Sequence, residues 1–128
     1  MKIAALDLGT NTFQLLIAEL FNGELKKLEN KVIITRLGAG FDNEKKLLSR
    51  DSINRSIDVL VNYSNIIKKY EIKEIRAVAT SVVRNAVNSN KFIDEAYKKS
   101  GIKIEVISGI QEAKLSSLGV INSIKPKT

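Results

Sequence analysis

The first quarter of the chain alternates short apolar runs with turn-forming residues, and this pattern constrains the fold more than any other feature. Residues 3–6 and 15–18 are apolar runs, and the polar segment 7–12 between them predicts two strands joined by a tight turn. Asn22 and Gly23 form the dipeptide most typical of a two-residue hairpin. The chain should therefore begin with an antiparallel meander of three strands, at residues 2–7, 13–20 and 24–35.

The remainder of the chain alternates helical and strand patterns. Ser49 is a typical N-cap, and the apolar stripe that follows it predicts a long amphipathic helix ending near Tyr70. Residues 75–79 and 102–107 predict two further strands, and Gly101 is typical of the end of the helix before the second. Because helices connect them, these strands should join the sheet in parallel. The helices are expected at residues 49–70, 82–87, 89–100 and 110–122.

This element order, β-β-β-α-β-α-β-α, predicts an α/β fold with a mixed five-stranded sheet. The chain has 128 residues, of which 44% are hydrophobic, and this suits one domain with one core. No internal repeat or low-complexity segment divides it. We expect the domain to span residues 1–124 and a linker to start at residues 125–128, where Pro126 follows the last predicted helix.

The composition excludes several kinds of chemistry. The chain has neither cysteine nor histidine, which excludes disulfides, thiol catalysis, histidine general bases and the usual zinc sites. Catalysis must therefore use carboxylates, lysine, arginine, hydroxyl groups or a magnesium-type ion. The net charge of +7 favours polyanionic partners, although scattered, solvated lysines give the same charge. The four phenylalanines and three tyrosines form no stacking ladder, so nucleic acid is not the favoured partner.

The N-terminus and the hydropathy pattern predict the location of the protein. No apolar run approaches the roughly 18 residues that a bilayer-spanning helix needs. Met1 and Lys2 lead directly into the first strand, without the three-part pattern of a signal peptide. We therefore expect a cytoplasmic protein with no membrane partner.

Three polar turns follow predicted strands, and together they form the candidate site. The turns lie at residues 7–12, 80–84 and 108–112. The carboxyl ends of parallel strands meet at one edge of an open α/β sheet, which is where such folds bind ligands. Each turn alone is a weak indication of a site, and their predicted convergence is the stronger one.

The first turn has the residue types of a phosphate-binding loop. Asp7 can hold a hydrated magnesium ion or orient a water molecule. Gly9 lets the chain turn and lets a ligand approach the backbone. The side chains of Thr10, Asn11 and Thr12 and the backbone N–H groups can donate hydrogen bonds to phosphate oxygens. The same residues also suit an ordinary hairpin with a polar turn.

The other candidate residues each have two interpretations. Arg84 suits bidentate phosphate binding or a surface salt bridge. Glu112, in the first turn of the last predicted helix, is either a general base or a carboxylate that complements the helix dipole. Residues 36–42 either cover a ligand or connect the third strand to the long helix; we favour the connection, with a secondary contact role for Arg36. Arg55, on the polar face of that helix, is expected to be solvated.

Taken together, these segments resemble the exopolyphosphatase/guanosine pentaphosphate phosphatase family over nearly the whole chain. The resemblance implies an actin-like (ribonuclease H-like) fold of two similar domains, with a phosphate site in the cleft between them. It implies that this chain is the first of the two domains. It also implies hydrolytic release of terminal phosphate from polyphosphate or guanosine pentaphosphate, with Mg²⁺ as the metal. The matching segments are residues 7–13, 36–40, 77–88 and 104–113.

The resemblance also implies a role for each site residue. The catalytic residue is Glu112, which matches the family glutamate thought to activate the attacking water. Asp7 helps to place the metal or the water, and Arg84 holds a phosphate oxygen. The residues that cradle phosphate are Gly9, Thr10, Asn11 and Thr12.

Two departures from the family pattern affect what this chain is expected to do. Gln111 stands where the family often has a second glutamate. The chain also stops before the family's second glycine-rich phosphate loop, so we expect it to be inactive without the C-terminal domain of the same enzyme. Apolar surface that this domain would cover could support a homodimer.

Two other functions remain open on the sequence. One is an actin-like phosphotransferase of the sugar or acetate kinase type, which the first turn allows. The other is a basic module that binds polyanions without chemistry, which the net charge allows.

Overall fold

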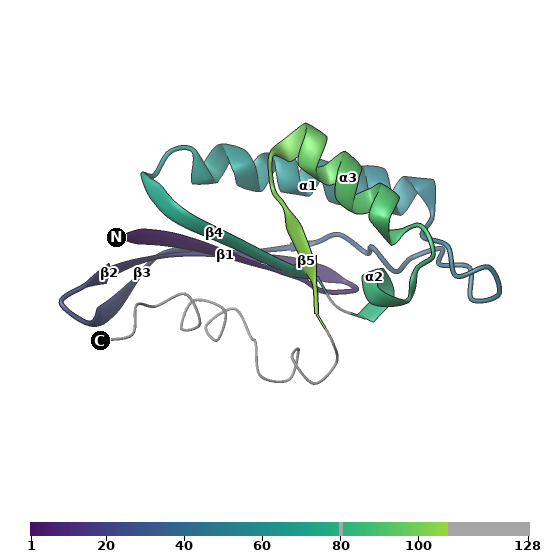
Figure 1. Cartoon of the computed structure of the whole chain (residues 1–128), viewed down its shortest axis with the longest axis horizontal. Coiled ribbons are helices and arrows are strands. Elements are labelled where there is room, and N and C mark those ends of the chain that lie inside the picture. Colours follow the sequence, from purple (N-terminus) through teal and green to yellow (C-terminus); the bar gives the residue numbers. More distant parts are fainter. Residues whose placement is uncertain (80, 108–128) are drawn as a thin grey trace.

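The computed structural model describes residues 1–79 and 81–107, which form a five-stranded sheet with helices packed on one face. Helices α1 and α3 lie side by side on that face (Figure 1). The elements, in chain order, are β1 (Lys2–Leu8), β2 (Thr12–Phe21), β3 (Glu24–Ile34), α1 (Arg50–Ile67), β4 (Ile72–Ala79), α2 (Ser81–Asn85), α3 (Ser89–Ser100) and β5 (Ile104–Val106).

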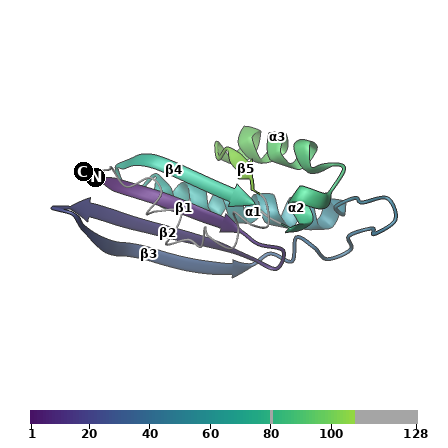
Figure 2. The same cartoon turned by 60° about the horizontal axis from the view of Figure 1, so that its bottom comes forward.

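The sheet has the order β3-β2-β1-β4-β5 and is mixed, as the sequence predicts. The pairs β1–β2 and β2–β3 are antiparallel, whereas β4 pairs in parallel with both β1 and β5. Figure 2 shows β3, β2, β1 and β4 side by side. Asn22 and Gly23 have φ values of 52° and 78°, and positive φ at both central residues is what a type I′ hairpin turn requires.

Several element ends differ from the sequence prediction. Strand β1 extends through Asp7 to Leu8, and β5 has only three residues instead of six. Helix α1 begins after Ser49, whose side chain accepts a hydrogen bond from the Ser52 N–H group, as predicted. The helix ends at Ile67, not near Tyr70, because the N–H groups of Lys69 and Tyr70 bond carbonyls only three residues back and so tighten the last turn.

Helix α3 matches its predicted bounds, and Gly101 ends it in the left-handed conformation with φ of 76°. Tyr97, near the end of this helix, is 55% exposed. The last predicted helix and the predicted linker lie outside the described residues.

Apolar residues form a cluster on each face of the sheet. The larger cluster lies between the sheet and the helices and includes Leu6, Phe13 and Leu60. Because side chains alternate along a strand, the neighbours of these strand residues point to the opposite face. That face holds the second cluster, formed by Ile3, Ala5, Leu16, Ala18, Val78 and Ile107 with the half-buried Leu20 and Leu25.

Tyr63 joins α1 to the meander through one buried hydrogen bond. Its side chain is fully buried, and its hydroxyl donates to the Phe13 carbonyl at 2.6 Å. Burial raises the pKa of Tyr63 to about 12. We expect Tyr63→Phe to lower the free energy of unfolding by about 1 kcal/mol at pH 8, the usual net value of one hydrogen bond.

The raised pKa of Tyr63 also sets the sign of a pH dependence. The unfolded chain ionises this phenol near pH 10, whereas the folded chain keeps it neutral to about pH 12, so the associated stability is complete below pH 10 and is lost as the pH rises toward 12. At pH 11 the wild type should therefore have lost stability on the order of 1 kcal/mol relative to Tyr63→Phe. Urea unfolding of both proteins at pH 8 and pH 11 measures this difference, and an equal loss in both would contradict it.

Candidate functional site

Three strands end side by side at one edge of the sheet. Leu8 pairs with Ala79, and Ala79 pairs with Val106, so β1, β4 and β5 finish in register. Gly9 follows β1 and Ile107 follows β5, on either side of the end of β4, and the Ile107 N–H group still bonds the Ala79 carbonyl at 3.0 Å. The predicted convergence is therefore present for the turn at residues 7–12 and for Ile107, which precedes the predicted turn at residues 108–112.

The turn after β1 is closed by its own backbone. The Gly9 N–H group donates to the Thr12 carbonyl at 2.9 Å, and a Cβ atom on Gly9 would lie 3.1 Å from that oxygen. The backbone N–H groups of Thr10 and Asn11 donate to no described acceptor. The side chains of Asn11 and Thr12 are exposed. The turn therefore offers N–H, hydroxyl and amide groups to a ligand.

Asp7 lies on the sheet face away from α1 and α3. It pairs with Gln14 on β2 and with Val78 on β4, and paired residues share a face. Asp7 and Gln14 are both half-buried, and Gln14 Nε2 donates to the Asn30 side chain at 2.9 Å. Gln14 was missed as a site neighbour, although strand alternation from Phe13 onward was enough to find it.

The loop after β3 packs on the turn after β1. It therefore does more than connect β3 to α1, which is the role that we favoured from the sequence. The Asn11 carbonyl accepts hydrogen bonds from the N–H groups of Thr35 at 2.9 Å and Arg36 at 3.0 Å. The Gly38 N–H group donates to the Thr10 carbonyl at 3.0 Å. These bonds hold the backbone of the turn from outside, so loop 36–40 forms part of the site's framework.

Arg55 is exposed, as predicted, but it also holds this loop in place, which the sequence did not indicate. Its Nε donates to the Thr35 carbonyl at 2.6 Å, and its Nη2 donates to the Arg36 carbonyl at 2.9 Å and to Ser52 Oγ at 3.1 Å. The residue is exposed overall, but its long side chain reaches along the protein surface to these groups.

Arg84, on α2, lies beside the chain that follows β5. Its Nη1 donates to the Ile107 carbonyl at 3.1 Å, which joins the second predicted turn to the start of the third. Thr80, Gln111 and Glu112 lie outside the described residues.

The described residues contain no group of three acidic side chains able to enclose a metal ion. Magnesium commonly keeps several waters and binds through one or two carboxylates together with substrate phosphates. The single carboxylate of Asp7, beside the turn after β1, fits that kind of site. Within residues 1–79 and 81–107, no helix is both long and apolar enough to cross a membrane.

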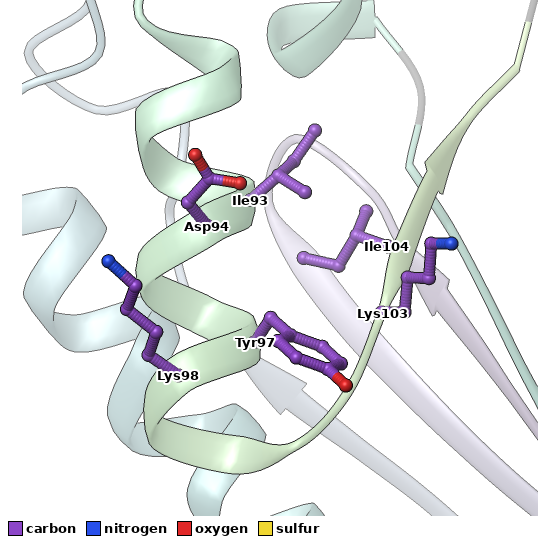
Figure 3. A pocket seen from close by; sticks show the side chains of 6 residues that line it. All are labelled: Ile93, Asp94, Tyr97, Lys98, Lys103 and Ile104. Carbon is purple, nitrogen blue, oxygen red and sulfur yellow. The ribbon is translucent and has the colours of Figure 1, made fainter.

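A separate cavity of about 330 Å³ lies between α3 and β5 (Figure 3). None of the predicted site residues lines it. Its wall is apolar, with charged groups around it, and the lining residues are Ile93, Asp94, Tyr97, Lys98, Lys103 and Ile104.

Comparison with known proteins gives one family. The model of the Ppx/GppA phosphatase family matches residues 16–128. A Haemophilus influenzae protein named "Putative exopolyphosphatase" is 31% identical over 122 residues, which are 95% of this chain and 38% of that protein.

Two solved structures share the fold over most of the chain. An exopolyphosphatase from Cytophaga hutchinsonii has a TM-score of 0.84 and 33% identity, over 88% of this chain and 36% of that chain. A Ppx/GppA family member from Aquifex aeolicus has a TM-score of 0.85 and 32% identity, over 99% of this chain and 41% of that chain. The chain thus spans about two fifths of the length of these relatives.

Proposed function

The chain belongs to the Ppx/GppA phosphatase family, and we propose that it is the N-terminal actin-like domain of an enzyme that releases terminal phosphate from polyphosphate. The observation that carries the proposal is that β1, β4 and β5 end in register. The turn after β1 and Arg84 therefore lie at the same edge of the sheet. Both polyphosphate and guanosine pentaphosphate end in a phosphoanhydride, so the same chemistry would serve either substrate.

The turn after β1 would bind the terminal phosphate. The N–H groups of Thr10 and Asn11 and the side chains of Asn11 and Thr12 would be the donors, and Gly9 lets the turn close tightly on the Thr12 carbonyl. Such donors are fixed by the fold and need no rearrangement as charge develops on the phosphate oxygens.

Asp7 would help to hold a magnesium ion, which neutralises charge on the substrate phosphates when bound. Arg84 would hold a phosphate oxygen. Its bond to the Ile107 carbonyl fixes it beside the segment that leads to Glu112.

Glu112 would be the general base. It would accept a proton from the attacking water as the water forms a bond to the terminal phosphorus and the bridging oxygen leaves with the rest of the chain. Without histidine or cysteine in the chain, a carboxylate is the natural group for this step. The second domain would close the cleft on the other side of the substrate.

A phosphate-release assay tests the proposal. The chain extended to the full length of its relatives should release orthophosphate from polyphosphate or guanosine pentaphosphate with Mg²⁺, whereas the 128-residue chain alone should show the background rate. If the extended protein releases none and instead transfers phosphate from ATP to a sugar or to acetate, the kinase interpretation replaces this one.

A further inference from the structure

A cavity of about 440 Å³ opens beside the turn after β1, on the side of the edge strand β3. Ile34, Arg36, Ala39 and Arg55 line it. The Arg36 N–H group is bonded directly to the Asn11 carbonyl at 3.0 Å, so the cavity and the turn share backbone contacts. A ligand that occupies the turn and extends past Asn11 therefore meets this cavity next.

The two arginines in this cavity keep their positive charge uncompensated. Neither Arg36 nor Arg55 forms an ion pair with a described residue. The hydrogen bonds of Arg55 go to two neutral carbonyls and one hydroxyl. The Arg36 side chain is exposed and bonds no described group. Two neighbouring guanidinium groups without a carboxylate form a site for an anion.

Arg36 also has an unusual backbone conformation. Its φ of 52° lies in the left-handed region, which costs a non-glycine residue roughly 1–2 kcal/mol. Bonds to Asn11 on one side and to Arg55 on the other hold it there. Residues held in such conformations cluster at ligand-binding sites.

We propose that Arg36 and Arg55 form an anion subsite that binds an inner phosphate group of an oligophosphate whose terminal phosphate occupies the turn. The ligand class rests on the proposed function. Arg36 supplies the exposed guanidinium that contacts the phosphate. Arg55 adds charge and acts mainly as a positioning residue, because its hydrogen bonds hold the Thr35 and Arg36 carbonyls. The subsite favours chains of three or more phosphates over orthophosphate.

Calorimetric titration of the 128-residue chain with sodium tripolyphosphate and with orthophosphate tests the subsite. Arg36→Gln should weaken tripolyphosphate binding about tenfold, the effect of one charge-assisted hydrogen bond, and change orthophosphate binding less than about twofold. Arg36→Lys, which keeps the charge, should recover part of the loss. Lys26→Gln, an exposed lysine at the far end of β3, removes the same charge and should change neither affinity.

The outcomes separate the subsite from the proposed function. An equal affinity of wild type and Arg36→Gln for tripolyphosphate would overturn the subsite, as would equal losses in Arg36→Gln and Lys26→Gln or the absence of tripolyphosphate binding by the wild type. Phosphate release by the extended protein is an independent readout. If Arg36-dependent tripolyphosphate binding is present but hydrolysis is not, the subsite stands and the hydrolase function fails.

Discussion

Replacing Glu112 with glutamine in the extended protein is expected to lower kcat for phosphate release about 10²–10⁴-fold, the usual contribution of a general base. Glutamine keeps the size and the polarity of the side chain but cannot accept the proton of the attacking water. Because the lost interaction forms mainly in the transition state, KM should change little. Steady-state release of phosphate from polyphosphate measures both constants.

Gln111→Glu is the matched control for this change. It alters the neighbouring side chain toward the residue that the family often carries, and kcat should stay within about threefold, because the residue touches no reacting group in the proposed mechanism. If Glu112→Gln keeps the full rate, Glu112 is only a carboxylate that complements the helix dipole, and the base must be another group.

Gly38→Ala is expected to lower kcat/KM of the extended protein about 10–100-fold, although Gly38 lies outside the phosphate-binding turn. A Cβ atom at this position would lie 2.5 Å from Thr10 Cγ2, closer than real Cβ atoms approach other heavy atoms. The Gly38 N–H group also bonds the Thr10 carbonyl, so the loop cannot move away without moving the turn. Displacement of a phosphate donor by about 1 Å is enough for a rate loss of this size.

Two further variants separate this steric effect from a general loss of stability. Gly23→Ala places alanine at φ of 78° with no atom within 4 Å of the new Cβ, so it strains the backbone without touching the turn. It should lower the free energy of unfolding by about 1 kcal/mol and leave kcat/KM unchanged. Thr10→Ser removes the methyl group that clashes and keeps the hydroxyl, so it should restore most of the activity of Gly38→Ala. Strictly additive losses in the double variant would contradict the steric explanation.

The sheet could be predicted because the sequence patterns that define it lie within short stretches of the chain. Apolar alternation and the Asn22–Gly23 turn define the meander, and a helix between two strands dictates that they run parallel. The ends of elements were less predictable. Strand β5 has three residues although 102–107 alternate regularly, because pairing with β4 extends only to Ala77, Val78 and Ala79.

The convergence of the strand ends could be predicted, whereas the contacts that support the first turn could not. The first turn follows directly from the strand ends, whose register the topology fixes. The support of that turn joins Arg55 to Arg36, 19 positions earlier in the chain, and Gly38 to Thr10. Such contacts leave no periodic pattern in the sequence. An arginine on the polar face of a helix is usually only solvated, and the path of the preceding loop is what shows that the exposed Arg55 also bonds the Thr35 and Arg36 carbonyls.

The hairpin between β2 and β3 has a practical value for measuring these effects. Strand β2 is ten residues long, so Asn22 and Gly23 lie about 30 Å along the sheet from Thr12 (Figure 2). Both residues and the adjoining Phe21 are exposed. A cysteine introduced at this tip would be the chain's sole thiol, so one fluorophore or surface linker could be attached there without touching any group that binds phosphate.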